Sequence, residues 1–202
     1  MQNGRLDLTD NKLITGSPVG TLNGSTYTGV TGLIQSGRNG GGWGGHGIVT
    51  SQSSATTGNF TSIGIATAQQ VKGLASPGDT AVFAGQTVTG TDTLVMYTYG
   101  GDANLDGKIN VYDYGHIDSS IPIGLSGWIN GDFNYDGKIN VDDYGIIDFN
   151  IGIQGAPFPT AAGIGSGALG GVTAVPEPTT LSLVGLAAAG LMGRRHRRRR
   201  LL

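Results

Sequence analysis

The 202-residue chain contains no cysteine, and charged residues make up only 13% of it. The absence of cysteine excludes disulfide bonds, zinc ribbons, iron–sulfur clusters and thiol catalysis. Carboxylates are scarce in the first hundred positions, which hold Asp7, Asp10, Asp79 and Asp92. A glycosidase needs two facing carboxylates, and these four stand beside turn sequences with nothing to pair them. The sequence therefore favours a structural or interaction protein over an enzyme.

Glycine is abundant, with 38 occurrences, and this indicates turns, short strands and linkers rather than a helical core. Runs of β-branched and aromatic residues at 63–66, 80–84 and 93–99 predict strands separated by turns. A short helix fits 67–74, and no other stretch in this half has a sustained helical period. Residues 1–100 are predicted to be a mainly β domain, either a β-sandwich or the end of a β-solenoid.

The glycine-rich segment 40–47 has more than one interpretation. Its glycines suggest a phosphate-binding loop, but the Gly-Lys-Ser/Thr ending and a strand–helix frame are both missing. We prefer a turn that packs Trp43. His46 and Ser51 suggest a nucleophile pair, although no acid close in sequence supports them.

Residues 101–153 contain a tandem repeat with a period of 30 residues, and each copy is rich in Asp and Asn. Calcium takes six to eight oxygen ligands, which a twelve-residue loop supplies from positions 1, 3, 5, 7, 9 and 12. The predicted ligands of the first loop are Asp102, Asn104, Asp106, the carbonyl of Lys108, Asn110 and Asp113. Those of the second loop are Asp132, Asn134, Asp136, the carbonyl of Lys138, Asn140 and Asp143.

Other positions of the repeat support this interpretation. Gly107 and Gly137 stand at position 6, where such a loop turns sharply. Ile109 and Ile139 stand at position 8, which is predicted to pair the two loops through a short β-bridge. The alternative is a pair of Asp/Asn-rich surface turns. Because both copies match every ligand position, the sequence predicts two bound Ca²⁺ ions.

A helix is predicted after each loop and none before it. Apolar residues recur three or four positions apart, so each helix has one apolar face that is predicted to pack against its twin. These residues are Val111, Tyr114, Ile117 and Ile121 in the first copy and Val141, Tyr144, Ile147 and Ile151 in the second.

Loop followed by helix, twice, with Asp in place of Glu at position 12, resembles a dockerin over about 50 residues. Dockerins bind cohesin modules and are common on polysaccharide-degrading assemblies. The resemblance therefore implies a docking role, with a cohesin-like or other surface protein as partner. Positions 10 and 11, often Ser-Thr in cellulosomal dockerins, are Val111-Tyr112 and Val141-Asp142 here.

The C-terminal part has two segments. Residues 154–174 are uncharged and rich in Gly, Ala, Pro and Ser, which predicts a flexible linker. Residues 175–202 carry Pro176, Glu177 and Pro178, an apolar run at 179–193, and then six arginines. Arginines after an apolar run stay on the cytoplasmic side of a membrane. A 15-residue helix is roughly 22 Å long, short for a hydrocarbon core of about 30 Å, so a transient anchor would fit.

Pro-Glu-Pro, one hydrophobic helix and a basic tail resemble the PEP-CTERM sorting signal of Gram-negative bacteria. In that family an exosortase recognises Pro-Glu-Pro. Two alternatives are an arginine block that binds nucleic acid and a short buried core helix. The first is disfavoured because Met1–Gly193 has 6 basic and 14 acidic residues, a net charge of −8.

The segments Gly4–Leu8 and Ser36–Gly41 resemble regions of large secreted planctomycete proteins with autotransporter-associated β-strand repeats. Met1–Asp7 has no apolar signal-peptide core, so we expect that the chain begins inside a longer protein or at a misassigned start. The sequence predicts an exported protein of the cell surface or extracellular matrix, anchored transiently or permanently in the inner membrane. The alternative function is a fragment of a polysaccharide-degrading enzyme or its accessory subunit.

Overall fold

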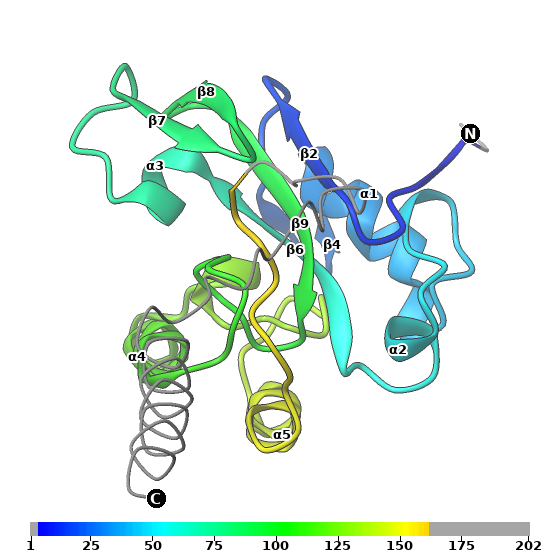
Figure 1. Ribbon diagram of the computed structural model, residues 1–202. Helices are drawn as coiled ribbons and strands as arrows, with labels where there is room; N and C mark the ends of the chain where they lie inside the picture. The colour runs from blue at the N-terminus through cyan, green and yellow to red at the C-terminus, as the bar shows by residue number, and fades with distance from the viewer. Residues whose placement is uncertain (1–3, 162–202) are drawn as a thin grey trace, which may run out of the picture. The chain divides into compact units, whose positions relative to one another are not determined.

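A three-stranded antiparallel sheet forms the centre of the computed structural model, which describes residues 4–161 (Figure 1). Its strand order is β2 (Lys12–Thr15), β9 (Thr93–Tyr99) and β6 (Thr61–Thr67). Every residue of the central strand β9 is buried, as expected for a run of β-branched and aromatic residues covered on both faces. The strands predicted at 63–66 and 93–99 are confirmed.

The other strands form three small two-stranded sheets. They are the parallel pair β1 (Arg5–Asp7) and β5 (Gly47–Val49), the hairpin β3 (Leu22–Asn23) and β4 (Thr26–Tyr27), and the hairpin β7 (Thr80–Phe83) and β8 (Gln86–Thr89). The strand predicted at 80–84 is confirmed as β7. The sequence predicted a sandwich or a solenoid, and the strands of residues 4–161 instead form one small sheet and these three pairs.

Three helices belong to the N-terminal region: α1 (Gly29–Arg38), α2 (Ser53–Thr56) and α3 (Ala68–Lys72). The short helix predicted at 67–74 is confirmed as α3, which begins with a capping box of Thr67 and Gln70. Helix α1 was not predicted, and it adds a ten-residue helix to a region that is otherwise mainly β, as the sequence predicts. A Cβ on Gly37 would overlap the carbonyl oxygen of Ile48, so this glycine allows α1 to lie directly against β5.

Helices α4 (Val111–Ser120) and α5 (Val141–Ile151) follow the two loops as predicted, and they lie below the sheet in Figure 1. Short 3₁₀ turns complete the fold at Asn39–Gly41, Ile121–Ile123 and Trp128–Asn130. None of the helices within residues 4–161 is both long enough and apolar enough to cross a membrane.

One hydrophobic cluster contains residues from both predicted domains, 1–100 and 101–153. Trp128, just before the second loop, and Leu105, inside the first, pack against Gly64 of β6, where a Cβ would meet both side chains. The ring of Trp128 also stacks on that of Tyr135, with centroids 5.5 Å apart. The loops therefore pack directly beneath the sheet.

The segment 154–160, which we call the C-terminal strap, runs alongside β9 (Figure 1). The hydroxyl of Tyr99 donates to the carbonyl of Ala156 at 2.9 Å, and the rings of Tyr99 and Phe158 are 4.6 Å apart. Thr160 accepts a hydrogen bond from the backbone of Ala84 at 3.1 Å. These residues are the first part of the segment 154–174 that was predicted as a flexible linker, and residues 162–174 lie outside the described residues.

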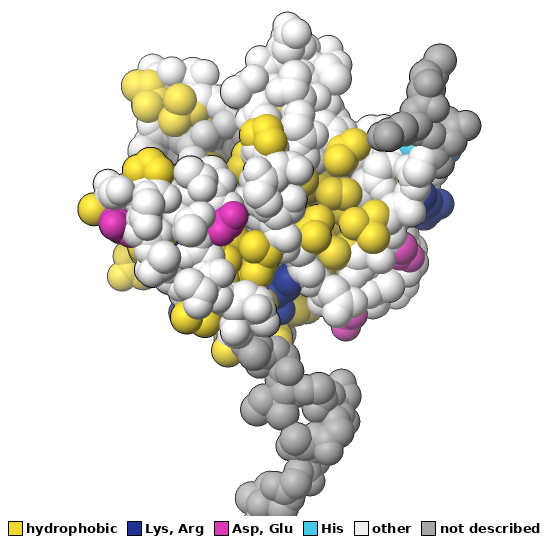
Figure 2. All heavy atoms as spheres, turned by 90° about the horizontal axis from the view of Figure 1, so that it is seen from above, with side chains coloured by type: hydrophobic (Ala, Val, Ile, Leu, Met, Phe, Trp, Pro, Cys, Tyr) yellow, Lys and Arg dark blue, Asp and Glu magenta, His cyan; other side chains and the backbone are white. Residues whose placement is uncertain are grey.

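Figure 2 shows one face of the unit from above, on which hydrophobic side chains gather in several places and charged side chains are few. The sparse charge on this face agrees with the 13% of charged residues in the sequence.

Candidate metal centre

The two loops have the same hydrogen bonds from backbone N–H groups to the first and last aspartates. In the first, Asp102 accepts from the backbone N–H of Asp106 (3.1 Å) and Gly107 (2.9 Å). In the second, Asp132 accepts from the equivalent groups of Asp136 (3.1 Å) and Gly137 (2.9 Å). The last Asp of each loop reaches back to its start, because Ala103 and Phe133 donate to Asp113 and Asp143 at 2.9 Å each.

The predicted turn at position 6 is present in both loops. Gly107 and Gly137 have φ angles of 91° and 86°, which favour glycine. Two positions earlier, Leu105 and Tyr135 also have positive φ angles, 57° and 61°. The backbone therefore repeats these unusual conformations at matching places in the two copies.

Positions 9 and 12 also determine where each helix begins. Asn110 is the N-cap of α4 and accepts from the backbone of Tyr112 at 2.9 Å, and Asp113 completes a capping box. Asn140 and Asp143 do the same for α5. Capping satisfies backbone N–H groups that the first helical turn leaves unpaired.

Four carboxylates of the loops are completely buried: those of Asp102, Asp113, Asp132 and Asp143. Burial raises the pKa of Asp102 to about 8 and that of Asp113 and Asp143 to about 6, and it also raises the pKa of Asp132. These shifts arise because burial penalises the charged form of a carboxylate. Hard oxygen donors of this kind suit a cation such as Ca²⁺.

Within residues 4–161, no three His, Cys, Asp or Glu side chains are gathered as a ready metal-binding group. Of the predicted ligands in the first loop, some side chains lie together and others do not. Asn104 and Asn110 donate to Asp106 at 3.5 and 3.4 Å, so these three side chains meet on one side of the first loop. Asp102 and Asp113 instead turn toward backbone N–H groups.

The two halves exchange contacts across an approximate two-fold relation. Ile117 of α4 lies against Gly131, which opens the second loop, and Ile147 of α5 lies against Gly101, which opens the first. Both isoleucines are fully buried. In the same reciprocal manner, the Tyr114 hydroxyl donates to Asp148 at 2.5 Å and the Tyr144 hydroxyl donates to Asp118.

One prediction about this contact is confirmed only in part and one was wrong. Ile117 and Ile147 of the predicted apolar faces are buried, whereas Val111 and Val141 are 73% and 78% exposed. The predicted β-bridge between Ile109 and Ile139 is absent from the described chain, where neither residue is in a strand or bridge. The side chain of Gln154 pairs with Ile109 instead, at 2.7 Å for each of two hydrogen bonds.

Residues remote in sequence hold the second loop, and none of them was predicted. The Tyr27 hydroxyl donates to Asp132 at 2.5 Å. From α1, Gln35 donates to the carbonyl of Tyr135 at 2.8 Å and Arg38 to that of Asn134 at 2.7 Å. The first loop is held by Thr98, whose hydroxyl donates to Asp102, and by Trp128, whose indole N–H donates to the Asp102 carbonyl at 2.7 Å.

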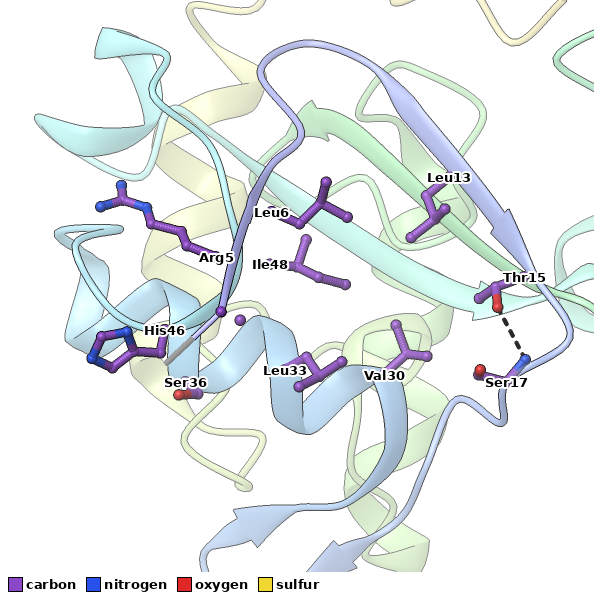
Figure 3. Close-up of a pocket in the computed structure, with 12 residues that line it drawn as sticks. Arg5, Leu6, Leu13, Thr15, Ser17, Val30, Leu33, Ser36, His46 and Ile48 are labelled. Atoms are coloured by element: carbon purple, nitrogen blue, oxygen red, sulfur yellow. Dashed lines mark hydrogen bonds between the residues drawn. The ribbon is translucent and has the colours of Figure 1, made fainter. Parts of the chain in front are cut away.

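A separate hollow of about 440 Å³ lies between β1, β2 and α1 (Figure 3). Arg5 and His46 lie toward one end and Thr15 and Ser17 toward the other. Of the described residues that line it, none is Asp or Glu. Its apolar lining consists of Leu6, Leu13, Val30, Leu33 and Ile48.

Carboxylates of the N-terminal region bond to nearby turns. Asp7 accepts from the backbone of Thr9 at 2.9 Å and of Ser51 at 3.0 Å. Asp79 accepts from Ser76, and Asp92 from Thr89. As predicted for the glycine-rich segment, Trp43 is buried, with 1% of its surface exposed.

The predicted sorting residues Pro176, Glu177 and Pro178 and the hydrophobic helix at 179–193 lie outside the described residues. Comparison with protein families matches residues 174–199 to the PEP-CTERM protein-sorting motif. The motif confirms the predicted sorting signal, and it supports export by an exosortase-dependent route to the cell surface or a membrane. No curated protein matches the chain. No solved structure matches it either.

Proposed function

We propose that this exported protein is a calcium-stabilised structural or interaction protein of the cell surface, whose two loops each bind one Ca²⁺ ion. The observation that carries the proposal is the repeated pattern of backbone hydrogen bonds to carboxylates in two loops that bury four of them. Buried carboxylates are unfavourable unless a cation or several donors compensate them. On ion binding, the side chains that now contact backbone N–H groups would turn toward a common centre.

The scarcity of paired carboxylates outside the loops favours a non-catalytic role. The acids of the N-terminal region bond to local turns, and the hollow in Figure 3 has no carboxylate in its described lining. A retaining or inverting glycosidase needs two carboxylates across one cleft. The enzyme alternative therefore has no candidate residues among those described.

Removing one ligand should remove one ion. Asp136→Ala is expected to lower the calorimetric stoichiometry from two Ca²⁺ to one, and Asp106→Ala should do the same at the other loop. Each change deletes a carboxylate that would ligate the ion directly. Asp142→Ala is the matched control, because this exposed residue lies beside a predicted ligand without being one. Two ions bound by Asp136→Ala, or one by the control, would contradict the assignment.

We assign docking to the outer surface of α4 and α5. Val111, Tyr112 and Val141 are strongly exposed there. Gly115 and Gly145 occupy the middle of the two helices, and a Cβ on either would meet nothing within 4 Å. Glycine inside a helix costs roughly 1 kcal/mol relative to alanine, and no contact in the described chain requires glycine at these two positions. A partner that approaches the helix backbone closely would require glycine there.

The partner that this surface fits is a cohesin-like or other surface protein with a complementary apolar face. We expect calcium-dependent binding of a cohesin module, measured by calorimetry, and its loss in the double variant Gly115→Arg, Gly145→Arg. Gly58→Arg is the control, because that glycine also has open space around it and lies elsewhere. If no cohesin module binds, or if the double variant binds normally, this docking assignment fails while the calcium assignment stands.

A further inference from the structure

The C-terminal strap takes the place that the second loop was predicted to occupy beside the first. The backbone N–H of Ile109 donates to Gln154 Oε1, and Gln154 Nε2 donates to the carbonyl of Ile109, both at 2.7 Å. A primary amide that both accepts and donates in this way reproduces the pairing of a neighbouring strand. No side chain of residues 4–161 makes the same pair of bonds to Ile139.

This contact bears directly on a proposed ligand. The N–H of Ile109 belongs to the same peptide group as the carbonyl of Lys108, the predicted position-7 ligand of the first loop. A trans peptide is planar, and its C=O and N–H point in opposite directions. Holding the N–H toward Gln154 therefore fixes the direction of the Lys108 carbonyl, which makes Gln154 a positioning residue for this loop.

The strap also covers the sharp turn of the loop. The backbone N–H of Phe158 donates to the carbonyl of Gly107 at 2.8 Å. Gly107 has a φ of +91°, and a Cβ there would overlap the carbonyl of Phe158. At the equivalent turn of the second loop, Gly137 faces the side chain of Leu22 in β3 instead. Only the first loop is thus bonded to the strap.

We propose that the strap is a calcium-dependent latch: Ca²⁺ in the first loop and the docked strap stabilise each other. The proposal rests on the calcium sites proposed above and adds a coupling that is specific to one of them. Such coupling is reciprocal. Whatever releases the strap therefore weakens Ca²⁺ binding at the first loop, and removal of the ion loosens the strap. The chain beyond the strap leads to the sorting motif at 174–199.

The latch would set how much free chain precedes that motif. Releasing residues 154–160 frees seven residues, and an extended chain spans up to ~3.5 Å per residue, so the free chain would lengthen by up to roughly 25 Å. Calcium bound at the first loop would therefore shorten the tether between the unit and the motif. Calcium at the second loop would not.

Hydrogen exchange in saturating calcium tests the latch with two loop variants of the full chain. The amide of Gly155 donates to the Tyr99 hydroxyl at 3.0 Å and that of Phe158 to Gly107. Asp106→Ala should speed exchange at both amides at least tenfold, because the first loop has lost its ion. Asp136→Ala should leave those two amides unchanged, since it empties the other loop. Amides of β5 serve as the reference for general unfolding. Equal protection of the strap in both variants would overturn the proposal.

Calorimetry on the Asp136→Ala background, which isolates the first loop, tests the reverse direction. Gln154→Ala should weaken calcium binding about tenfold, as expected for losing two modest hydrogen bonds. Gln86→Ala, at an exposed position of β8, should leave the affinity unchanged. An unchanged affinity in Gln154→Ala overturns the latch and leaves the calcium sites standing. A wild-type chain that binds no calcium would overturn both.

Discussion

In excess chelator, tertiary structure is expected to be lost throughout residues 4–161, including the sheet and α1. The loops and the sheet contribute to one hydrophobic cluster, and without cations the buried carboxylates of each loop have no compensating charge. Metal-binding energy at such sites is folding energy. At a free Ca²⁺ concentration 1,000 times the Kd, each ion adds about 4 kcal/mol to the free energy of unfolding. Two ions therefore contribute as much as the 5–15 kcal/mol that is typical for the stability of a whole domain.

Two buried tryptophans allow this prediction to be measured separately in each half. Trp43 reports on the region of α1 and β5, and Trp128 on the loops, so Trp128→Phe and Trp43→Phe variants each leave one fluorescent probe. Both probes should shift to the red together on chelation and return with Ca²⁺. Mg²⁺ should reverse less of the emission shift than Ca²⁺ does, because it demands tight octahedral geometry. If Trp43 keeps its emission while Trp128 changes, the halves fold independently and the prediction is wrong.

Gly37→Ala is expected to destabilise the protein by about 2–3 kcal/mol or more, although alanine is the better helix former. The added methyl group would occupy the position of the Ile48 carbonyl oxygen, and backbone cannot move as a flexible side chain can. Overpacking of this kind costs roughly 1–3 kcal/mol even where side chains can adjust. Denaturant unfolding in saturating calcium measures the change.

Gly115→Ala and Gly145→Ala are the matched controls for that substitution. Each places the same methyl group in the interior of a helix where nothing lies within 4 Å. Both should raise the unfolding free energy by about 0.5–1 kcal/mol. A stabilising Gly37→Ala would show that α1 does not lie as close to β5 as the structure places it.

The loops and the helices that follow them could be predicted because their information is local. Asp102 bonds to residues four and five positions away, and Asn110 caps the helix that begins at the next residue. Strand β9 was predicted for a similar reason, since its composition alone indicates a buried strand. The loops and caps contain their own partners, and β9 is recognisable from its composition although its partner strands lie far away.

Helix α1 could not be predicted because its glycines have two possible meanings. Gly29, Gly32 and Gly37 resemble turn residues in sequence, and their low helix propensity hides the spacing of Val30 and Ile34. In the structure, Gly32 and Gly37 allow the helix backbone to approach Tyr27 and β5. Which meaning applies depends on what packs against the helix, and a single sequence does not contain that information.

The residues that hold the second loop, and the strap residue that holds the first, were missed because they lie far away along the chain. Tyr27 is 105 positions from Asp132, Arg38 is 96 from Asn134, and Gln154 is 45 from Ile109. The sequence also overstated how much of each helix is buried. Apolar spacing indicated one face of each helix, but Val111 and Val141 are exposed and only the isoleucines of the central turns are buried.

The reciprocal contact between the halves has a consequence for any shorter form of the protein. Each repeat contributes one isoleucine that fills space beside a glycine of the other repeat, and one tyrosine that bonds to the other's aspartate. A single repeat, cut away from its twin, would carry both parts of this contact and could use neither. Two identical copies could satisfy this particular contact for one another. The tandem pair is thus arranged like a symmetric dimer joined into one polypeptide.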